Sequence, residues 1–260
     1  MKWYKRFGLE ENPFTTDPFK SDYTLVNYSQ IVEDLLYYTA SGSIVLLEGE
    51  SGSGKTMMLR QIISRFEGYG KVVYVEGDKL KQDLDVEAVL NKKGHGLIGN
   101  MMKKKPNGMI LLLDNVSQIS ARNFEKIKYY FDQDYIRSVI FTIHDNSDID
   151  LPPSMVDRIA RRHIVIPPLI NFDALRIVRD RFSDHFFLSD EVILKLFKIS
   201  EGNVRKLLNN CDKVCNFVVK QGRGEVLSKY VNIALATKKK KVQKNLASIE
   251  VHPKHAEAEQ

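Results

Sequence analysis

Cysteine is scarce in this sequence. The 260 residues include two, Cys211 and Cys215, which stand four positions apart in a segment with helical apolar spacing. A metal site would need further ligands, and neither cysteine nor histidine stands near this pair to supply them. We therefore expect two buried structural thiols rather than a metal site.

Long apolar runs are missing as well. None approaches the roughly 20 residues that a membrane-spanning helix requires. The segment Met1–Arg6 is basic, but no long apolar stretch follows it, so we expect no signal peptide. Internal repeats are also lacking. These absences favour a cytoplasmic globular protein with no membrane insertion.

Positive charge is in excess, and much of it is local. The formal net charge is +6, and the tail from Lys238 to Gln260 contains six lysines and three glutamates. We expect this polar tail, residues 237–260, to be disordered. Two further basic stretches, Lys92–Lys93 and Lys103–Lys105, stand in the middle of the chain. A basic balance of this kind is compatible with nucleic acid as a partner and is equally compatible with solvated loops.

One motif dominates what is present. Residues 49–56 fit the phosphate-loop pattern of glycine, four residues and Gly-Lys-Thr at every fixed position. The run Ser43–Leu47 before them predicts a buried strand, and Met57–Ile63 after them predicts a helix. This strand–loop–helix context is the one that the motif requires. The predicted nucleotide-binding residues are Gly49, Glu50, Ser51, Gly52, Ser53, Gly54, Lys55, Thr56 and Met57.

The residue types of the loop explain its chemistry. Glycines let successive backbone N–H groups turn inward around an anion, and the helix N-terminus adds the positive end of its dipole. Lys55 can reach the β- and γ-phosphates of ATP, and the Thr56 hydroxyl can ligate Mg²⁺. The expected ligands are therefore ATP and Mg²⁺.

A second motif is an apolar strand that ends in a carboxylate. The run Met109–Asp114 predicts a buried strand, and Asp114 at its end is expected to lie near the Mg²⁺. Asn115 follows, where most hydrolytic proteins of this class carry glutamate. Asparagine can orient a water molecule, but it cannot take its proton. We therefore expect weak ATP hydrolysis, with Ser117 and Gln118 as further groups that could position water.

Strand and helix patterns alternate up to Pro167–Pro168, and the pattern beyond is helical. This order predicts an α/β fold, a doubly wound parallel five-stranded sheet followed by a small all-helical domain, which the family resemblance described below implies is a lid domain. We expect an α/β domain over residues 1–168 and a lid over 169–236. The expected strands are 44–48, 71–76, 109–114, 139–143 and 163–166, and the expected helices are 55–66, 84–91, 119–132, 153–160, 172–183, 189–199, 203–219 and 225–236.

With these motifs in this order, residues 20–236 resemble the AAA+ ATPase family. The resemblance implies a polar "sensor 1" residue at the end of the fourth strand, where His144, Asp145 and Asn146 are all candidates. It also implies that the segment with Val26, Asn27 and Tyr28 packs against adenine.

The resemblance implies roles for two arginines. Arg158, with Arg161 and Arg162 as alternatives, is similar to the arginine finger that enters a neighbouring subunit's site, so we expect self-association or an AAA+ partner. Arg205, in the run Gly202-Asn203-Val204-Arg205, is similar to the "sensor 2" arginine that reaches the γ-phosphate from the lid. Together with Lys55, Asp114 and Asn115, these arginines form the expected catalytic set.

The opening Phe7-Gly8-Leu9 with Asn12-Pro13-Phe14 is similar to ExeA-type ATPases and to archaeal origin-recognition-type initiators. After Ala236 we expect neither the winged-helix domain of initiators nor the collar domain of clamp loaders. The resemblance implies an ATP-controlled switch in a DNA replication or recombination complex. The alternatives are a non-hydrolysing subunit stabilised by ATP and a secretion or pilus ATPase.

Overall fold

In the computed structural model, the described residues are 2–20, 23, 25–66, 71–77, 85–94, 107–116, 119–145, 149–184 and 186–236; the side chains of 91–94 are outside this description. They form two compact units. One consists of Asp17–Leu169, and the other combines Met1–Thr16 with the chain from Ile170 onward. The tail 237–260, Ser117, Gln118, Asn146 and the lysines at 103–105 lie outside the described residues.

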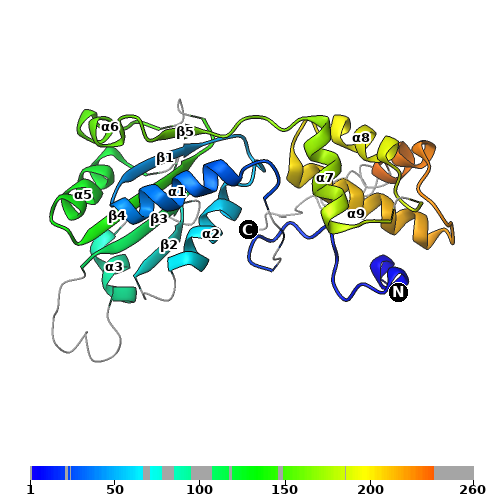
Figure 1. Ribbon diagram of the computed structural model, residues 1–260, viewed down its shortest axis with the longest axis horizontal. Helices are drawn as coiled ribbons and strands as arrows, with labels where there is room; N and C mark the ends of the chain where they lie inside the picture. Colours follow the sequence, from blue (N-terminus) through cyan, green and yellow to red (C-terminus); the bar gives the residue numbers. More distant parts are fainter. Residues whose placement is uncertain are drawn as a thin grey trace, which may run out of the picture. The chain divides into compact units, whose positions relative to one another are not determined.

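The first unit contains a parallel five-stranded sheet in the order β2-β3-β4-β1-β5, which confirms the predicted fold class (Figure 1). Apolar side chains fill β1, β3 and β4, as expected for parallel strands covered on both faces. The strands are β1 (Ile44–Glu48), β2 (Val72–Glu76), β3 (Met109–Asp114), β4 (Ile136–Ile143) and β5 (His163–Val165).

Helices cover both faces of this sheet (Figure 1). Leu35 of α1 (Ser29–Ser41) and Met58 of α2 (Lys55–Phe66) belong to one apolar cluster. Phe124 of α5 (Ala121–Asp132) belongs to the cluster on the opposite face, with α3 (Val86–Gly94) and α6 (Pro153–Ile159). Because successive strand residues alternate between faces, neighbours such as Val45 and Leu46 enter different clusters.

The second unit is helical and contains an aromatic centre. It includes η1 (Trp3–Phe7), α7 (Asn171–Arg181), α8 (Asp190–Ile199), α9 (Val204–Lys220) and a helix over residues 228–236. Trp3 stacks on Phe14 and Phe187 and meets Phe182 edge to face. Both thiols of α9, Cys211 and Cys215, are buried as expected, and this burial raises their pKa values.

The place of the N-terminal segment differs from the expectation that residues 1–168 form one domain. Residues 1–16 group with the helical unit instead. Their anchor is Asp212 of α9, whose Oδ1 accepts hydrogen bonds from Trp3 Nε1 at 2.7 Å and from Asn12 Nδ2 at 2.8 Å. Arg6 also donates to the carbonyl of Arg223 at 2.8 Å. Burial of the aromatic rings and these polar contacts together explain the grouping.

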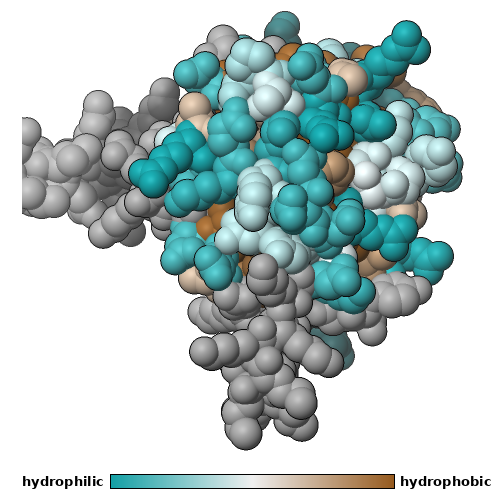
Figure 2. Space-filling view, turned by 90° about the vertical axis from the view of Figure 1, so that its left-hand side faces the viewer, coloured by the Kyte–Doolittle hydropathy of each residue, from teal (hydrophilic) through white to brown (hydrophobic). Residues whose placement is uncertain are grey.

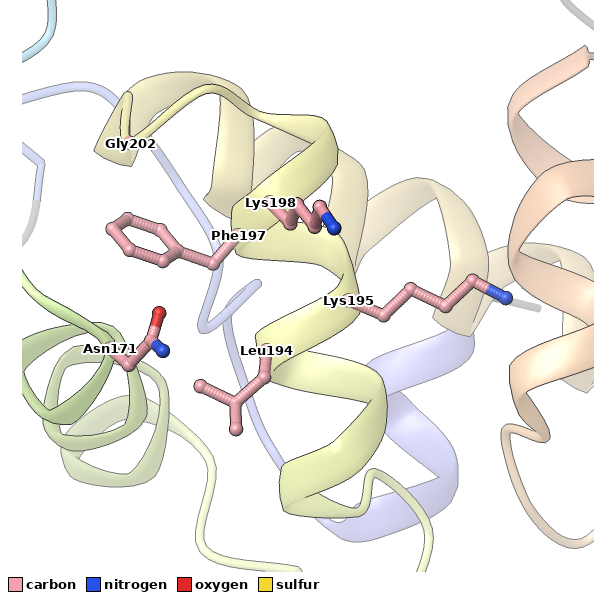
Figure 3. A pocket seen from close by; sticks show the side chains of 6 residues that line it. All are labelled: Asn171, Leu194, Lys195, Phe197, Lys198 and Gly202. Atoms are coloured by element: carbon pink, nitrogen blue, oxygen red, sulfur yellow. The ribbon is translucent and has the colours of Figure 1, made fainter.

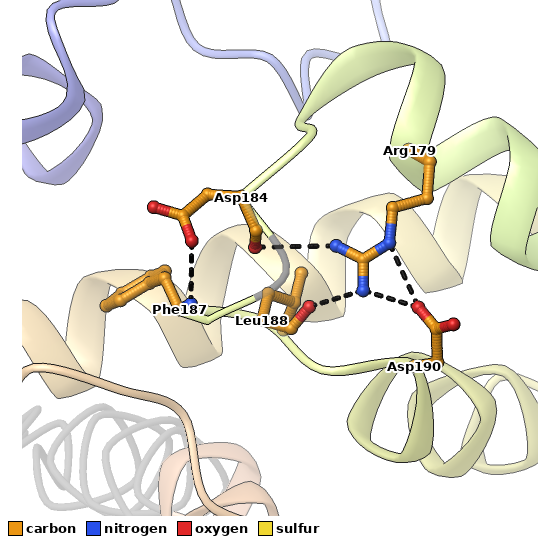
Figure 4. A network of polar contacts seen from close by, with 5 residues as sticks. All are labelled: Arg179, Asp184, Phe187, Leu188 and Asp190. Carbon is orange, nitrogen blue, oxygen red and sulfur yellow. Dashed lines mark hydrogen bonds and ion pairs between the residues drawn. The ribbon is translucent and has the colours of Figure 1, made fainter.

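A partly buried arginine organises the connection between α7 and α8 (Figure 4). Arg179 of α7 ion-pairs with Asp190, which begins α8, and donates to the carbonyls of Leu188 at 2.6 Å and Asp184 at 3.4 Å. Asp184 Oδ1 in turn accepts from the backbone N–H of Phe187 at 2.9 Å. One guanidinium thus satisfies acceptors on both sides of the turn, which matches its fork of five donors.

Candidate nucleotide site at the sheet edge

The phosphate loop joins β1 to α2 at the carboxyl edge of the sheet. Gly52 and Gly54 adopt φ of 81° and 103°, a region that residues with a Cβ rarely enter. The ammonium of Lys55 folds over the loop and donates to the carbonyls of Gly49 and, at 3.0 Å, Glu50. A cation and the N-terminus of α2 therefore meet at the same loop, which is the electrostatic arrangement that binds phosphate.

Ser53 supplies a further indication of a ligand in the loop. Its Oγ is buried and has no hydrogen-bond partner among the described residues. A buried hydroxyl without a partner is costly in a protein interior. A phosphate oxygen is an acceptor that would satisfy it, so the loop fits the expected nucleotide.

Asp114 lies at the centre of a hydrogen-bond network next to the loop. Its Oδ2 accepts from Thr56 Oγ1 at 2.7 Å and from Tyr74 OH at 2.9 Å. Its Oδ1 accepts from Thr142 Oγ1 at 2.6 Å. The carboxylate is nearly buried, and the three donors come from α2, β2 and β4. Asp114 therefore links the phosphate loop to both neighbouring strands.

The donor set fits Mg²⁺. Thr56 and Asp114 present a hydroxyl and a carboxylate oxygen 2.7 Å apart, and Mg²⁺ prefers hard oxygen ligands. Sites of this kind take one or two protein ligands, with phosphate and water completing the shell. Accordingly, no cluster of three or more His, Cys, Asp or Glu side chains with metal-binding geometry occurs in the described part of the chain.

The phenol of Tyr74 is strongly affected by this carboxylate. Burial, and after it the negative charge of Asp114, raises the pKa of Tyr74 far above its ordinary value. The phenol therefore stays protonated and donates to Asp114 at any physiological pH. Its ring is held edge to face against Phe19, with 5.5 Å between the ring centroids.

Thr142 lies at the position where β4 meets the site. The three sensor 1 candidates come later in the chain: His144 and Asp145 are exposed, and Asn146 lies outside the described residues. Thr142 is fully buried, donates to Asp114 and accepts from the backbone N–H of Asn115 at 2.9 Å. Thr142 and Tyr74 belong to no sequence motif; a polar residue inside an otherwise apolar strand was the available signal for each.

Asn115 follows Asp114 in an unusual backbone conformation. Its φ is 60°, in the left-handed region that asparagine tolerates better than most residues. Gly77 packs directly against it, because a Cβ on Gly77 would lie 1.9 Å from the carbonyl oxygen of Asn115. The chain after β2 and the chain after β3 are thus in close backbone contact.

The segment expected to contact adenine lies beside the loop. Leu25 Cδ2 lies 3.2 Å from the place where a Cβ on Gly54 would stand. Val26 and Tyr28 are buried, and Tyr28 OH donates to the carbonyl of Pro167 at 3.0 Å. The segment is therefore fixed next to the phosphate loop, and its contact with adenine remains a prediction.

The two predicted arginines lie in different units. Arg158 of α6 is half exposed and ion-pairs with Asp132 of α5 at 2.7 Å, where Lys128 also binds the same carboxylate at 2.9 Å. Figure 2 shows the face of the α/β unit on which α5 and α6 lie as mainly hydrophilic. Arg205 is the second residue of α9 and is exposed, just after the Asn203 side chain that caps this helix through Lys206 N. The roles of both arginines remain predictions.

A separate cavity of about 450 Å³ lies in the helical unit (Figure 3). Leu194 and Phe197 of α8 face Asn171 of α7, whereas Lys195 and Lys198 point away from them. The Lys195 ammonium binds the carbonyl and hydroxyl of Ser228. This lining is mainly apolar.

Comparison with known proteins agrees with this architecture. A family model described as AAA domain matches residues 41–172, just over half of the chain. No curated protein matches the sequence. No helix in the described ranges combines the length and apolar character needed to cross a membrane.

Three solved structures share the fold. Cdc6p from Pyrobaculum aerophilum aligns with a TM-score of 0.69 at 13% identity, over 87% of this chain and 70% of its own. Orc1 of Aeropyrum pernix, in complex with DNA, aligns with a TM-score of 0.65 at 17% identity, over 88% of this chain and 71% of its own. The Holliday junction branch migration motor RuvB of Thermotoga maritima aligns with a TM-score of 0.61 at 15% identity, over 80% of this chain and 69% of its own.

Proposed function

Since the chain belongs to the AAA domain family, we propose that it binds ATP with Mg²⁺ at the phosphate loop and hydrolyses it slowly as a conformational switch. The observation that carries the proposal is the hydrogen bond between Thr56 and Asp114, 58 residues apart, which joins the loop to the end of β3. Lys55 would bind the β- and γ-phosphates, and Thr56 with Asp114 would hold the metal. The bound ion would neutralise phosphate charge.

We place this switch in a DNA replication or recombination complex. The support is the shared fold with Cdc6p, a DNA-bound Orc1 and a branch migration motor, together with the net charge of +6. ATP would favour one arrangement of the two units and ADP another, with Arg205 contacting the γ-phosphate in the first.

Nucleotide binding by the Lys55→Ala variant tests the site. Loss of the ammonium removes charge-assisted hydrogen bonds worth about 1.5–3 kcal/mol, so ATP affinity should fall at least about tenfold. Equilibrium titration with a fluorescent ATP analogue measures it. Lys71→Ala, an exposed lysine before β2, is the matched control and should bind normally. If Lys55→Ala also bound ATP normally, the site would be wrong.

Steady-state turnover with and without duplex DNA tests the process. Stimulation by DNA that weakens with added salt would support the nucleic-acid partner.

One observation favours a second function: Asn115 stands where a catalytic glutamate is usual. Tight ATP binding without turnover, with or without DNA, would indicate a subunit that ATP merely stabilises.

A further inference from the structure

The end of β2 brings a second acidic side chain to the sheet edge. In the parallel pairing of β2 with β3, Glu76 lies directly opposite Asp114. Successive strand residues point to opposite faces, so Glu76 shares a face with Tyr74. Tyr74 donates to Asp114 Oδ2, so this is the face on which the Asp114 carboxylate lies.

The position of Glu76 along β2 favours a side chain that reaches into the nucleotide site. The phenol of Tyr74 already spans from β2 to the carboxylate of β3. Glu76 stands two residues further on, about 6.6 Å closer to the carboxyl edge, where the phosphate loop begins.

Close backbone packing fixes Glu76 in this place. There is no room for a side chain at Gly77. A Cβ at this position would lie 1.9 Å from the carbonyl oxygen of Asn115 and 2.9 Å from the carbonyl oxygen of Asp114. The segments Glu76–Gly77 and Asp114–Asn115 therefore form one rigid pair. This contact joins the backbone at the carboxyl ends of β2 and β3.

We propose that Glu76 is the catalytic base of this ATPase and supplies the carboxylate that Asn115 lacks. The inference rests on the proposed ATP hydrolysis. Glu76 takes a proton from a water molecule as the water oxygen bonds to the γ-phosphorus. The bond from that phosphorus to the β–γ bridging oxygen breaks, its electron pair leaves with ADP, and phosphate is released.

Asn115 has a complementary role in this arrangement. Its amide can orient the attacking water by hydrogen bonding but cannot accept the proton. Asparagine also suits the backbone, since it tolerates a φ of 60° better than most residues do. The base and the orienting group are thus divided between two neighbouring strand ends.

Replacement of the carboxylate by its amide tests the proposal. Glu76→Gln should lower ATP turnover about 100-fold or more, since a general base contributes 10²–10⁴-fold. ATP affinity should change less than about threefold, because the amide keeps the size and shape of the side chain. Glu33→Gln, the same change on the exposed side of α1, is the control and should keep full turnover. Lys55→Ala defines the background rate.

A second variant separates chemistry from structure. In the Glu76→Gln background, Asn115→Glu returns a carboxylate to the same pair of segments. The double variant should hydrolyse ATP at least about tenfold faster than Glu76→Gln alone. Wild-type turnover in Glu76→Gln, loss of its ATP binding, or no recovery in the double variant would each overturn the base assignment. If the wild-type protein itself bound ATP but did not hydrolyse it, the base assignment would also be overturned, and the nucleotide site would stand. Absence of ATP binding would overturn the proposed function itself.

Discussion

Asp114 shows which site contacts can be predicted from residues and which depend on the fold. The motifs predicted Thr56 and Asp114 as neighbours, and they lie 2.7 Å apart. Tyr74 and Thr142 were not predicted, because each stands inside an apolar strand without a motif. They reach Asp114 because β2 and β4 flank β3 in the sheet, and strand order follows from packing of the whole unit.

At this scale, Tyr74→Phe tests the contribution of the phenol to metal binding. The ring and its contact with Phe19 remain, and one hydrogen bond to the carboxylate is lost. Asp114 should be less well oriented, and the Mg²⁺ concentration for half-maximal ATP binding should rise about 2–10-fold, as one hydrogen bond implies. Magnesium titration of nucleotide binding measures it, and binding without Mg²⁺ should not change.

Tyr130→Phe is the matched control for this change, since its hydroxyl donates to Glu87 at 3.2 Å and not to Asp114. An unchanged magnesium titration in Tyr74→Phe would show that the phenol only packs.

The elements were predicted well, and one grouping was not. Helix 55–66 and the strands 44–48 and 109–114 have the expected bounds, because apolar periodicity and the phosphate loop define them locally. The grouping of residues 1–16 with the helical unit depends on contacts such as Trp3 with Asp212, 209 positions apart. The aromatic residues of the first segment indicate that it is buried, but they do not indicate which unit it packs against.

At the scale of elements, Asp212→Ala tests the anchoring of this segment. The change leaves the Trp3 and Asn12 donors without their shared acceptor, which should lower the free energy of unfolding of the helical unit by about 1–3 kcal/mol. Trp3 is the single tryptophan of the chain, so its fluorescence reports on the segment during urea unfolding. Asp157→Ala, an exposed position on α6, should leave both emission and midpoint unchanged. An unaltered transition in Asp212→Ala would contradict the anchor.

At the scale of the whole molecule, we propose that Arg158 acts between copies of the chain. Its ion pair with Asp132 is half exposed, and such pairs contribute about 0–1 kcal/mol, so the arginine can leave it at small cost. The hydrophilic face of the α/β unit around α5 and α6 favours a polar contact there (Figure 2).

ATP should therefore promote self-association that Arg158→Ala abolishes and that Asp132→Asn, which removes the competing charge, preserves. Light scattering on a sizing column with and without ATP measures the mass. A wild-type protein that stays monomeric in saturating ATP would rule out this role for Arg158.

The divided helical unit has a consequence for biosynthesis. Its first piece, residues 1–16, leaves the ribosome ahead of the whole α/β unit, and its second piece starts at Ile170. At translation rates of about 5–20 residues per second, Trp3 waits roughly 10–40 seconds for α9 to emerge. During that interval the aromatic segment is available to chaperones, while the sheet can already assemble. The nucleotide site would thus form on the nascent chain before the tryptophan finds its place.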